Sequence, residues 1–179
     1  CSFDRADEVL ATYAKKNYEK HLKDAQKWID GDEKRNLYAQ EKTRKDIYDA
    51  MQSLEYEINT LFTSNGQTPF VTVGFGLGTD WYAREIQKAI LNVRIKGLGK
   101  EHRTAIFPKL IFTLKRGLNL EVGTPNYDIK TLALECSTKR MHPDILSYDK
   151  IVELMGSFKA SMGCRSFLHG WNEYNSNDV

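Results

Sequence analysis

The sequence has few cysteines and no long apolar run. Its three cysteines, Cys1, Cys136 and Cys164, are widely spaced. An odd number of distant cysteines, without a signal peptide, argues against a disulfide framework, so we expect reduced thiols and a cytoplasmic protein. No apolar stretch approaches the roughly 18 residues that a membrane-spanning helix requires. The sequence therefore predicts a soluble intracellular protein with no membrane partner.

An excess of charge of one sign is also missing. The 26 basic and 24 acidic side chains give a formal net charge of +2, which supplies no electrostatic reason to expect direct nucleic-acid binding. Hydrophobic residues make up 41% of the 179 positions, so the chain can bury a core and fits one domain. It begins with Cys1 instead of Met and ends in a polar stretch. We therefore expect an internal piece of a longer polypeptide.

The first third of the chain is predicted to form two long helices. Apolar residues recur at helical spacing from residue 3 to about residue 29, and again from about Leu37 to residue 62. Gly31 and Asp32 interrupt the pattern, which predicts an antiparallel pair joined by a short polar turn. We assign residues 1–65 to this helical pair.

The remaining residues, 66–179, alternate between strand-like and helix-like patterns. This alternation is typical of a parallel α/β sheet, and three strands are so few that we expect part of a larger sheet or barrel. Thr79 or Asp80 can cap the first of the helices, and Pro108 is expected to distort the second strand locally. The predicted strands are 68–76, 105–114 and 145–146, and the predicted helices are 81–94, 127–141 and 149–155.

Two glycine-rich segments suggest nucleotide-binding loops but do not match the known patterns. Residues 74–79 lie between a strand and a helix, where dinucleotide sites place glycine. The third glycine of that fingerprint is replaced by Thr79, and the acidic residue about 20 positions later is missing, so a nicotinamide or flavin site is disfavoured. We expect instead a glycine-rich strand end that lets a substrate or neighbouring loop come close. Gly99 and Lys100 lack the phosphate-loop spacing and are interpreted as a helix-terminating turn.

The cysteines away from the N-terminus receive different interpretations. Cys136 lies in an apolar helical run and is interpreted as a buried structural thiol rather than a metal ligand. Cys164 lies between Gly163, which permits a tight loop, and Arg165, whose charge can bias a thiol or hold an anion. A reactive cysteine and an ordinary loop cysteine both remain open from these residues. No histidine is placed as its base, since His169 is five residues on, so cysteine-nucleophile catalysis is not supported.

Five motifs occur in order along the chain. They are residues 67–79, 90–100, 104–112, 134–146 and 162–168. Together they resemble the anaerobic, glycyl-radical (class III) ribonucleoside-triphosphate reductases, most closely those of phage and enterobacterial type, and the resemblance covers nearly the whole chain. The last motif is similar to the family's radical-cysteine loop, with Cys164 in the place of the radical cysteine. The family usually has proline where this chain has Ser161, a departure that bears on the rigidity of the loop.

The resemblance implies a fold and a reaction. The family folds as a ten-stranded α/β barrel of two half-barrels around a central cysteine loop. This chain is expected to supply about one half-barrel's strands, that loop and a long N-terminal helical pair. Cys164 would be the catalytic residue, with Gly163, Arg165 and Ser166 as its neighbours in the substrate loop. Its thiyl radical would abstract the 3′ hydrogen of a ribonucleoside triphosphate, and the 2′ hydroxyl would leave as water.

The resemblance also implies partners and cofactors. Residues 1–65 resemble the region of the dimer contact and effector site, which implies a homodimer and allosteric dNTP or ATP effectors. This segment is expected to bind no cofactor and no metal. The family's C-terminal glycyl radical, made by an S-adenosylmethionine and iron–sulfur activating enzyme, and its C-terminal zinc site lie outside this chain, as does the second active-site cysteine. The remainder of the reductase chain would therefore be an obligatory partner in deoxyribonucleotide synthesis for DNA replication, with formate or a dithiol as reductant.

Two alternatives remain open. A glycyl-radical lyase of the pyruvate formate-lyase type usually has two adjacent cysteines in the loop, whereas Cys164 stands alone. A catalytically inactive truncated fragment would act at most as a nucleotide-binding or dimerising module, because part of a barrel exposes strand edges. Under the reductase interpretation as well, the isolated chain is expected to be inactive.

Overall fold

The computed structural model describes residues 2–61 and 66–159 of the chain. The described residues form an α/β fold of four strands and five helices, which confirms the predicted class. In chain order the elements are β1 (Ser2–Phe3), α1 (Ala6–Ala25), α2 (Asp32–Thr60), β2 (Thr72–Phe75), α3 (Trp81–Lys96), β3 (Lys109–Leu114), α4 (Tyr127–Arg140), β4 (Asp144–Ser147) and α5 (Tyr148–Met155). No helix in these ranges is long and apolar enough to cross a membrane.

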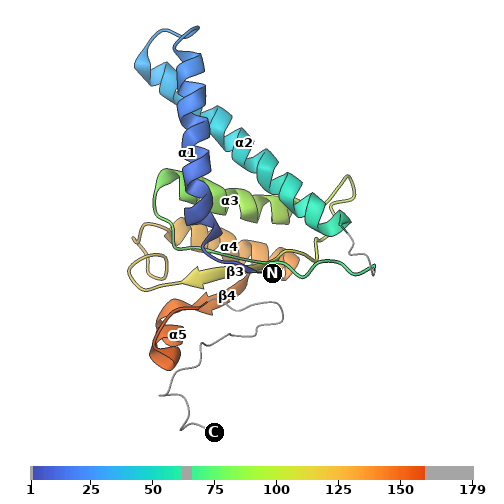
Figure 1. The fold of residues 1–179 in the computed structure, drawn as a ribbon. Helices are drawn as coiled ribbons and strands as arrows, with labels where there is room; N and C mark the ends of the chain where they lie inside the picture. The colour runs from blue at the N-terminus through green and yellow to red at the C-terminus, as the bar shows by residue number, and fades with distance from the viewer. Residues whose placement is uncertain (1, 62–65, 160–179) are drawn as a thin grey trace.

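The four strands form one parallel sheet in the order β1-β2-β3-β4. Strands that are neighbours in the sheet are also neighbours in the sequence, and right-handed crossovers then place the connecting helices on one face. Figure 1 shows α1 to α4 on one side of the sheet and α5 beyond β4. A doubly wound sheet would reverse its strand order, whereas α/β barrels keep this sequential order. The described residues are therefore consistent with part of a barrel, and the ten-stranded barrel itself stays a prediction.

The helical pair of the first third is confirmed. α1 and α2 contact each other and cross at an angle in Figure 1, and both also contact α3. Polar contacts join the two helices, with His21 Nε2 2.6 Å from Asp46 Oδ2 and the Tyr18 hydroxyl 3.0 Å from Asn36 Oδ1. The proposed division of the chain at residue 65 falls within residues 62–65, which lie outside the described ranges, and it stays a prediction.

Several element boundaries differ from the sequence-based expectation, and β2 begins at Thr72 where the predicted strand began at residue 68. The predicted first helix began at residue 3, but Ser2 and Phe3 form a strand paired with β2, which two residues are too few to reveal by periodicity. α2 begins at Asp32 rather than near Leu37. β3 begins at Lys109 instead of residue 105, because Pro108 has no N–H to donate to a sheet ladder. Pro108 thus lies just before the strand, whereas the sequence analysis predicted a local distortion inside a longer strand.

The core lies between the sheet and the helices. Alternate residues of β2 and β3 face the helix layer, and Phe75 and Phe112 meet edge to face with ring centroids 5.6 Å apart. α3 is the central helix, and its predicted buried side is confirmed. Asp80 caps it by accepting hydrogen bonds from the N–H groups of Tyr82 and Ala83. The buried residues of α3 that were predicted are Ile86, Ala89, Ile90 and Val93.

Candidate active site

The carboxyl ends of parallel strands lie at one edge of a sheet, and α/β enzymes bind their ligands there. We call this edge of the present sheet the carboxyl edge. Its backbone leads from the strands into helices and loops that carry both charged and glycine residues. The residues that directly follow the strands are Asp4 and Arg5 after β1, Gly76–Gly78 after β2, Lys115 and Arg116 after β3, and the aromatic Tyr148 after β4.

The segment Gly76–Gly78, here called the glycine loop, is held by buried side chains of α1 and α3. Asp7 Oδ2 accepts hydrogen bonds from the N–H of Gly76 at 3.2 Å and of Gly78 at 2.8 Å. Gln87 Nε2 donates to the same carboxyl oxygen and to the Gly78 carbonyl, both at 2.8 Å. Asp7 and Gln87 have no exposed surface. The first turn of α1 is thereby joined to the end of β2.

Two buried asparagines hold the carbonyl groups of the same loop. Asn119 Nδ2 donates to the Gly76 carbonyl at 3.0 Å and to the Thr113 carbonyl at 2.8 Å. Asn126 Nδ2 donates to the Gly78 carbonyl at 2.7 Å. Both glycines therefore have their N–H and C=O groups paired with side chains that are distant in sequence. This fixes the backbone of the loop in one conformation.

Glycine is required at both ends of the loop. Gly76 has φ of +123°, and a Cβ there would lie 2.9 Å from the Thr113 carbonyl oxygen. A Cβ at Gly78 would lie 2.4 Å from Ala83 Cβ. These distances are below normal contact, so the missing side chains let neighbouring segments come close. This agrees with the expectation for a glycine-rich strand end.

A small cavity lies against the glycine loop at the carboxyl edge. Its lining includes Arg5, Asp7, Leu77 and Phe158. Asp7 Oδ1 is buried without a hydrogen-bond partner among the described residues. Burial raises the pKa of Asp7, and the hydrogen bonds from the loop N–H groups act in the opposite direction. Phe158 also stacks on Tyr148, which follows β4, with ring centroids 4.7 Å apart. Phe158, one of the last described residues, therefore lies at this edge of the sheet.

The predicted site residues follow directly in the sequence but lie outside the described residues. Cys164 is six positions after Phe158. Its predicted neighbours Gly163, Arg165 and Ser166 also fall in 160–179. The assigned roles of all four therefore stay predictions.

Sequence reasoning missed the buried polar residues around the glycine loop. Asp7 matches the common pattern of an acidic residue in a first helical turn. Asn119 and Asn126 match turn residues. The available signal was Gln87, a polar residue that directly follows Ile86 within the apolar stripe of α3. A polar side chain at such a position needs a buried partner, which points to a network.

A second buried charge cluster lies at the opposite, amino edge of the sheet. Arg94 Nε donates to Glu55 Oε1 at 2.9 Å, and Arg94 Nη2 donates to the Pro108 carbonyl at 2.7 Å. Burial raises the pKa of Glu55, and the charge and hydrogen bond of Arg94 oppose that shift. These residues join α2 and α3 to the start of β3. Arg94 Nη1 is buried without a hydrogen-bond partner among the described residues.

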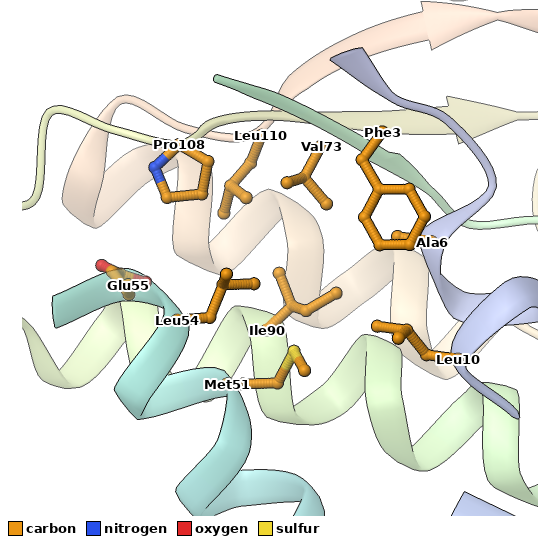
Figure 2. Close-up of a pocket in the computed structure, with 10 residues that line it drawn as sticks. All are labelled: Phe3, Ala6, Leu10, Met51, Leu54, Glu55, Val73, Ile90, Pro108 and Leu110. Atoms are coloured by element: carbon orange, nitrogen blue, oxygen red, sulfur yellow. The ribbon is translucent and has the colours of Figure 1, made fainter. Parts of the chain in front are cut away.

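An apolar cavity lies between the helices and the sheet, close to Glu55. Figure 2 shows side chains of the helix layer facing those of the strands across it. Only Glu55 brings a charged group to its lining. The helix residues include Leu10, Met51 and Ile90, and the strand residues are Phe3, Val73 and Leu110. This lining offers packing surface without convergent polar groups, so we do not assign chemistry to it.

Cys136 is a structural thiol, as predicted. It is fully buried in α4, and its sulfur lies 3.6 Å from the Leu91 carbonyl oxygen. Burial raises the pKa of the thiol to about 11. A thiol with this pKa is protonated at neutral pH and unreactive as a nucleophile.

A sequentially wound parallel sheet with a rigid loop at its carboxyl edge is an architecture of α/β enzymes. The family model for anaerobic ribonucleoside-triphosphate reductase matches residues 1–178, and the chain belongs to this family. This confirms the resemblance found in the sequence motifs.

Similar proteins come from bacteria and a phage, and each is named anaerobic ribonucleoside-triphosphate reductase. The protein of Haemophilus influenzae is 62% identical over 176 residues, which cover 96% of this chain and 24% of the relative. That of Escherichia coli K12 is 57% identical over 178 residues, covering 99% and 25%. That of Enterobacteria phage T4 is 54% identical over 180 residues, covering 99% and 29%. The chain thus spans about a quarter of the length of these relatives.

Proposed function

We propose that this chain is the segment of an anaerobic ribonucleoside-triphosphate reductase that carries the cysteine directly responsible for attack on the substrate. The main support is the family match over residues 1–178. The carboxyl edge adds to it, because Phe158, shortly before Cys164, lines the cavity next to the glycine loop. The cysteine would therefore follow a segment that reaches the edge where α/β enzymes bind substrates.

The proposed reaction exchanges hydrogen atoms with the sugar. The Cys164 thiol gives its hydrogen atom to the glycyl radical of the complete polypeptide. The sulfur radical takes the 3′ hydrogen of the ribonucleoside triphosphate, and the 2′ hydroxyl leaves as water after protonation. Formate or a dithiol supplies two electrons, a second proton is delivered to C2′ to form its new C–H bond, and the 3′ hydrogen then returns from the cysteine. The products are a deoxyribonucleoside triphosphate, water and the oxidised reductant.

The chemistry accounts for the residue type at position 164. An S–H bond is close enough in strength to a ribose C–H bond for reversible transfer of a hydrogen atom. Such a transfer needs no base beside the sulfur, in keeping with the absence of a suitably spaced histidine in the sequence. A closed site would also keep water and oxidants away from the radical.

The partners follow from the same proposal. The remainder of the reductase chain would complete the barrel and supply the radical glycine, the second active-site cysteine and the zinc site. A radical-forming activating enzyme would act on that remainder. The pair α1 and α2 would contribute to a homodimer and to the binding of nucleotide effectors, and the apolar residues Val9, Tyr13 and Leu54, which remain exposed on it, support a further packing partner.

A substitution of the sulfur tests the proposal. In the complete reductase polypeptide that contains this segment, Cys164→Ser is expected to abolish deoxynucleotide formation while the glycyl radical signal in electron paramagnetic resonance persists. Cys136→Ser is the matched control, because Cys136 is buried and structural, and it is expected to retain turnover. Reduction of ribonucleotides by the Cys164→Ser protein would refute the assignment.

A further inference from the structure

We propose that Asp7 is a positioning residue of this active site, which holds the glycine loop so that Leu77 forms a fixed apolar wall beside the substrate sugar. The inference rests on the proposed reductase function. Asp7 acts in it through the loop and does not touch the reacting atoms. The reaction sequence given above assigns no role to either residue.

The geometry of Asp7 joins two parts of the carboxyl edge. A single carboxyl oxygen accepts three hydrogen bonds, two from the glycine loop and one from Gln87. The loop donors are 69 and 71 positions away in the sequence, and the α3 donor is 80 positions away. Asp7 lies just after β1, so these bonds set the position of the β2 loop relative to the neighbouring strand.

Packing alone does not explain why a carboxyl group is buried at this position. A buried carboxyl loses hydration, and its second oxygen Oδ1 has no partner among the described residues. The other three side chains that hold the loop, Gln87, Asn119 and Asn126, are neutral amides. Three converging N–H groups need an acceptor oxygen that carries no hydrogen, which either a carboxylate or an amide oxygen provides. The unfavourable burial of Asp7 is thus tied to precise placement of the loop.

These hydrogen bonds fix the position of Leu77. The peptide groups on both sides of it belong to glycines whose N–H and C=O groups are all paired with buried side chains. Leu77 is half-buried, and it lines the cavity together with Arg5 and Phe158. A wall held in place by such hydrogen bonds limits how far a bound substrate can shift from the position that the reaction needs.

The test compares two changes at Asp7 in the complete reductase polypeptide. Asp7→Asn keeps an oxygen that can accept all three hydrogen bonds, and it is expected to hold kcat/KM within about threefold of the parent. Asp7→Ala leaves three donors unpaired and lets the loop move, and it is expected to lower kcat about 100-fold with a smaller change in KM. Leu77→Ala is expected to lower kcat similarly. The Asp7→Ala/Leu77→Ala double variant should then be little worse than either single one, because both act through one wall.

A matched control separates positioning from stability. Glu55→Ala removes a buried carboxyl at the amino edge, away from the glycine loop, and its kcat should match the parent under conditions where it is folded. The inference is overturned if Asp7→Asn is as impaired as Asp7→Ala, since the charge would then act directly, or if folded Asp7→Ala keeps the parent's kcat. If Asp7→Ala does not fold, the other two variants decide the question. The inference is overturned if Leu77→Ala keeps the parent's kcat, or if Asp7→Asn shows a large loss of kcat/KM.

Failure of this inference and failure of the proposed function have different signatures. An inactive Cys164→Ser protein together with a fully active, folded Asp7→Ala protein rejects only the positioning role. Turnover by the Cys164→Ser protein rejects the reductase assignment of that cysteine whatever the Asp7 variants show.

Discussion

Arg94→Met is expected to destabilise the chain by about 3–5 kcal/mol at neutral pH, the range seen when one member of a buried ion pair is removed. The side chains of Arg94 and Glu55 are 0% and 6% exposed, so water cannot replace the lost partner. The substitution removes the 2.9 Å bond to Glu55 and the 2.7 Å bond to the Pro108 carbonyl. It leaves a carboxylate in an apolar setting beside the cavity of Figure 2.

The pH dependence identifies that carboxylate as the cause. Burial already raises the pKa of Glu55 above its ordinary value of 4.5, and loss of Arg94 raises it further because the opposing charge is gone. A carboxyl whose folded-state pKa is raised binds more protons when folded, so its stability contribution falls as pH rises through the interval between the unfolded and folded values. The penalty of Arg94→Met is therefore expected to be smallest in acid and to grow toward neutral pH.

Urea unfolding of the 179-residue chain at pH 5 and pH 8 measures this effect. Arg94→Met/Glu55→Met should recover most of the loss, leaving about 1–3 kcal/mol for the unpaired Pro108 carbonyl. Lys139→Met is the control, since it removes an exposed pair with Glu135 and should change stability by less than about 1 kcal/mol. A loss under about 1 kcal/mol for Arg94→Met at pH 8, or a double variant as unstable as the single one, refutes the reasoning.

Two further predictions concern the glycine loop and the buried thiol. Gly78→Ala should lower the free energy of unfolding by about 1–3 kcal/mol, because the new Cβ would meet Ala83 Cβ. Gly99→Ala is the control: Gly99 has φ of +64° but open space around it, so the free energy of unfolding should fall by about 1 kcal/mol. Equal losses of the two variants in urea titrations would contradict the predicted crowding at Gly78. Cys136, whose pKa is about 11, should resist iodoacetamide at pH 8 in the folded chain and react in urea, as followed by mass spectrometry of its tryptic peptide. Equal rates in the two states would show that the thiol is accessible.

The sequence predicted α3 well because its signals are local. The cap at Asp80, the apolar stripe and the glycine that follows the last turn all lie within one helix and its flanks. β1 could not be predicted in the same way, since two residues carry no period and their pairing depends on β2, about 70 positions away. The pairing of Ser2 and Phe3 with Thr72 and Val73 is a long-range contact, and such contacts leave no local signal in the sequence.

The polar network of the site was hidden for the same reason. Asp7 and Gly78 share a hydrogen bond across 71 positions, and although the glycine-rich segment was noticed in the sequence, nothing in it pointed to Asp7. Cys164 was noticed in the sequence because glycine and arginine flank it directly. Local chemistry can thus mark a candidate reactive residue, whereas the residues that position a site become visible only when the strand order is known.

The glycine loop shows why the dinucleotide fingerprint was approached but not matched. In dinucleotide folds, glycine after a strand exposes backbone N–H groups that bind the negative charge of a pyrophosphate. Here the N–H groups of Gly76 and Gly78 both donate to the Asp7 carboxyl, so a side chain of the protein occupies the position that an external anion would take. The two glycines are still needed, because Thr113 and Ala83 come too close for any Cβ. The third position of the fingerprint, where glycine allows close packing of helix on strand in dinucleotide folds, is Thr79 here.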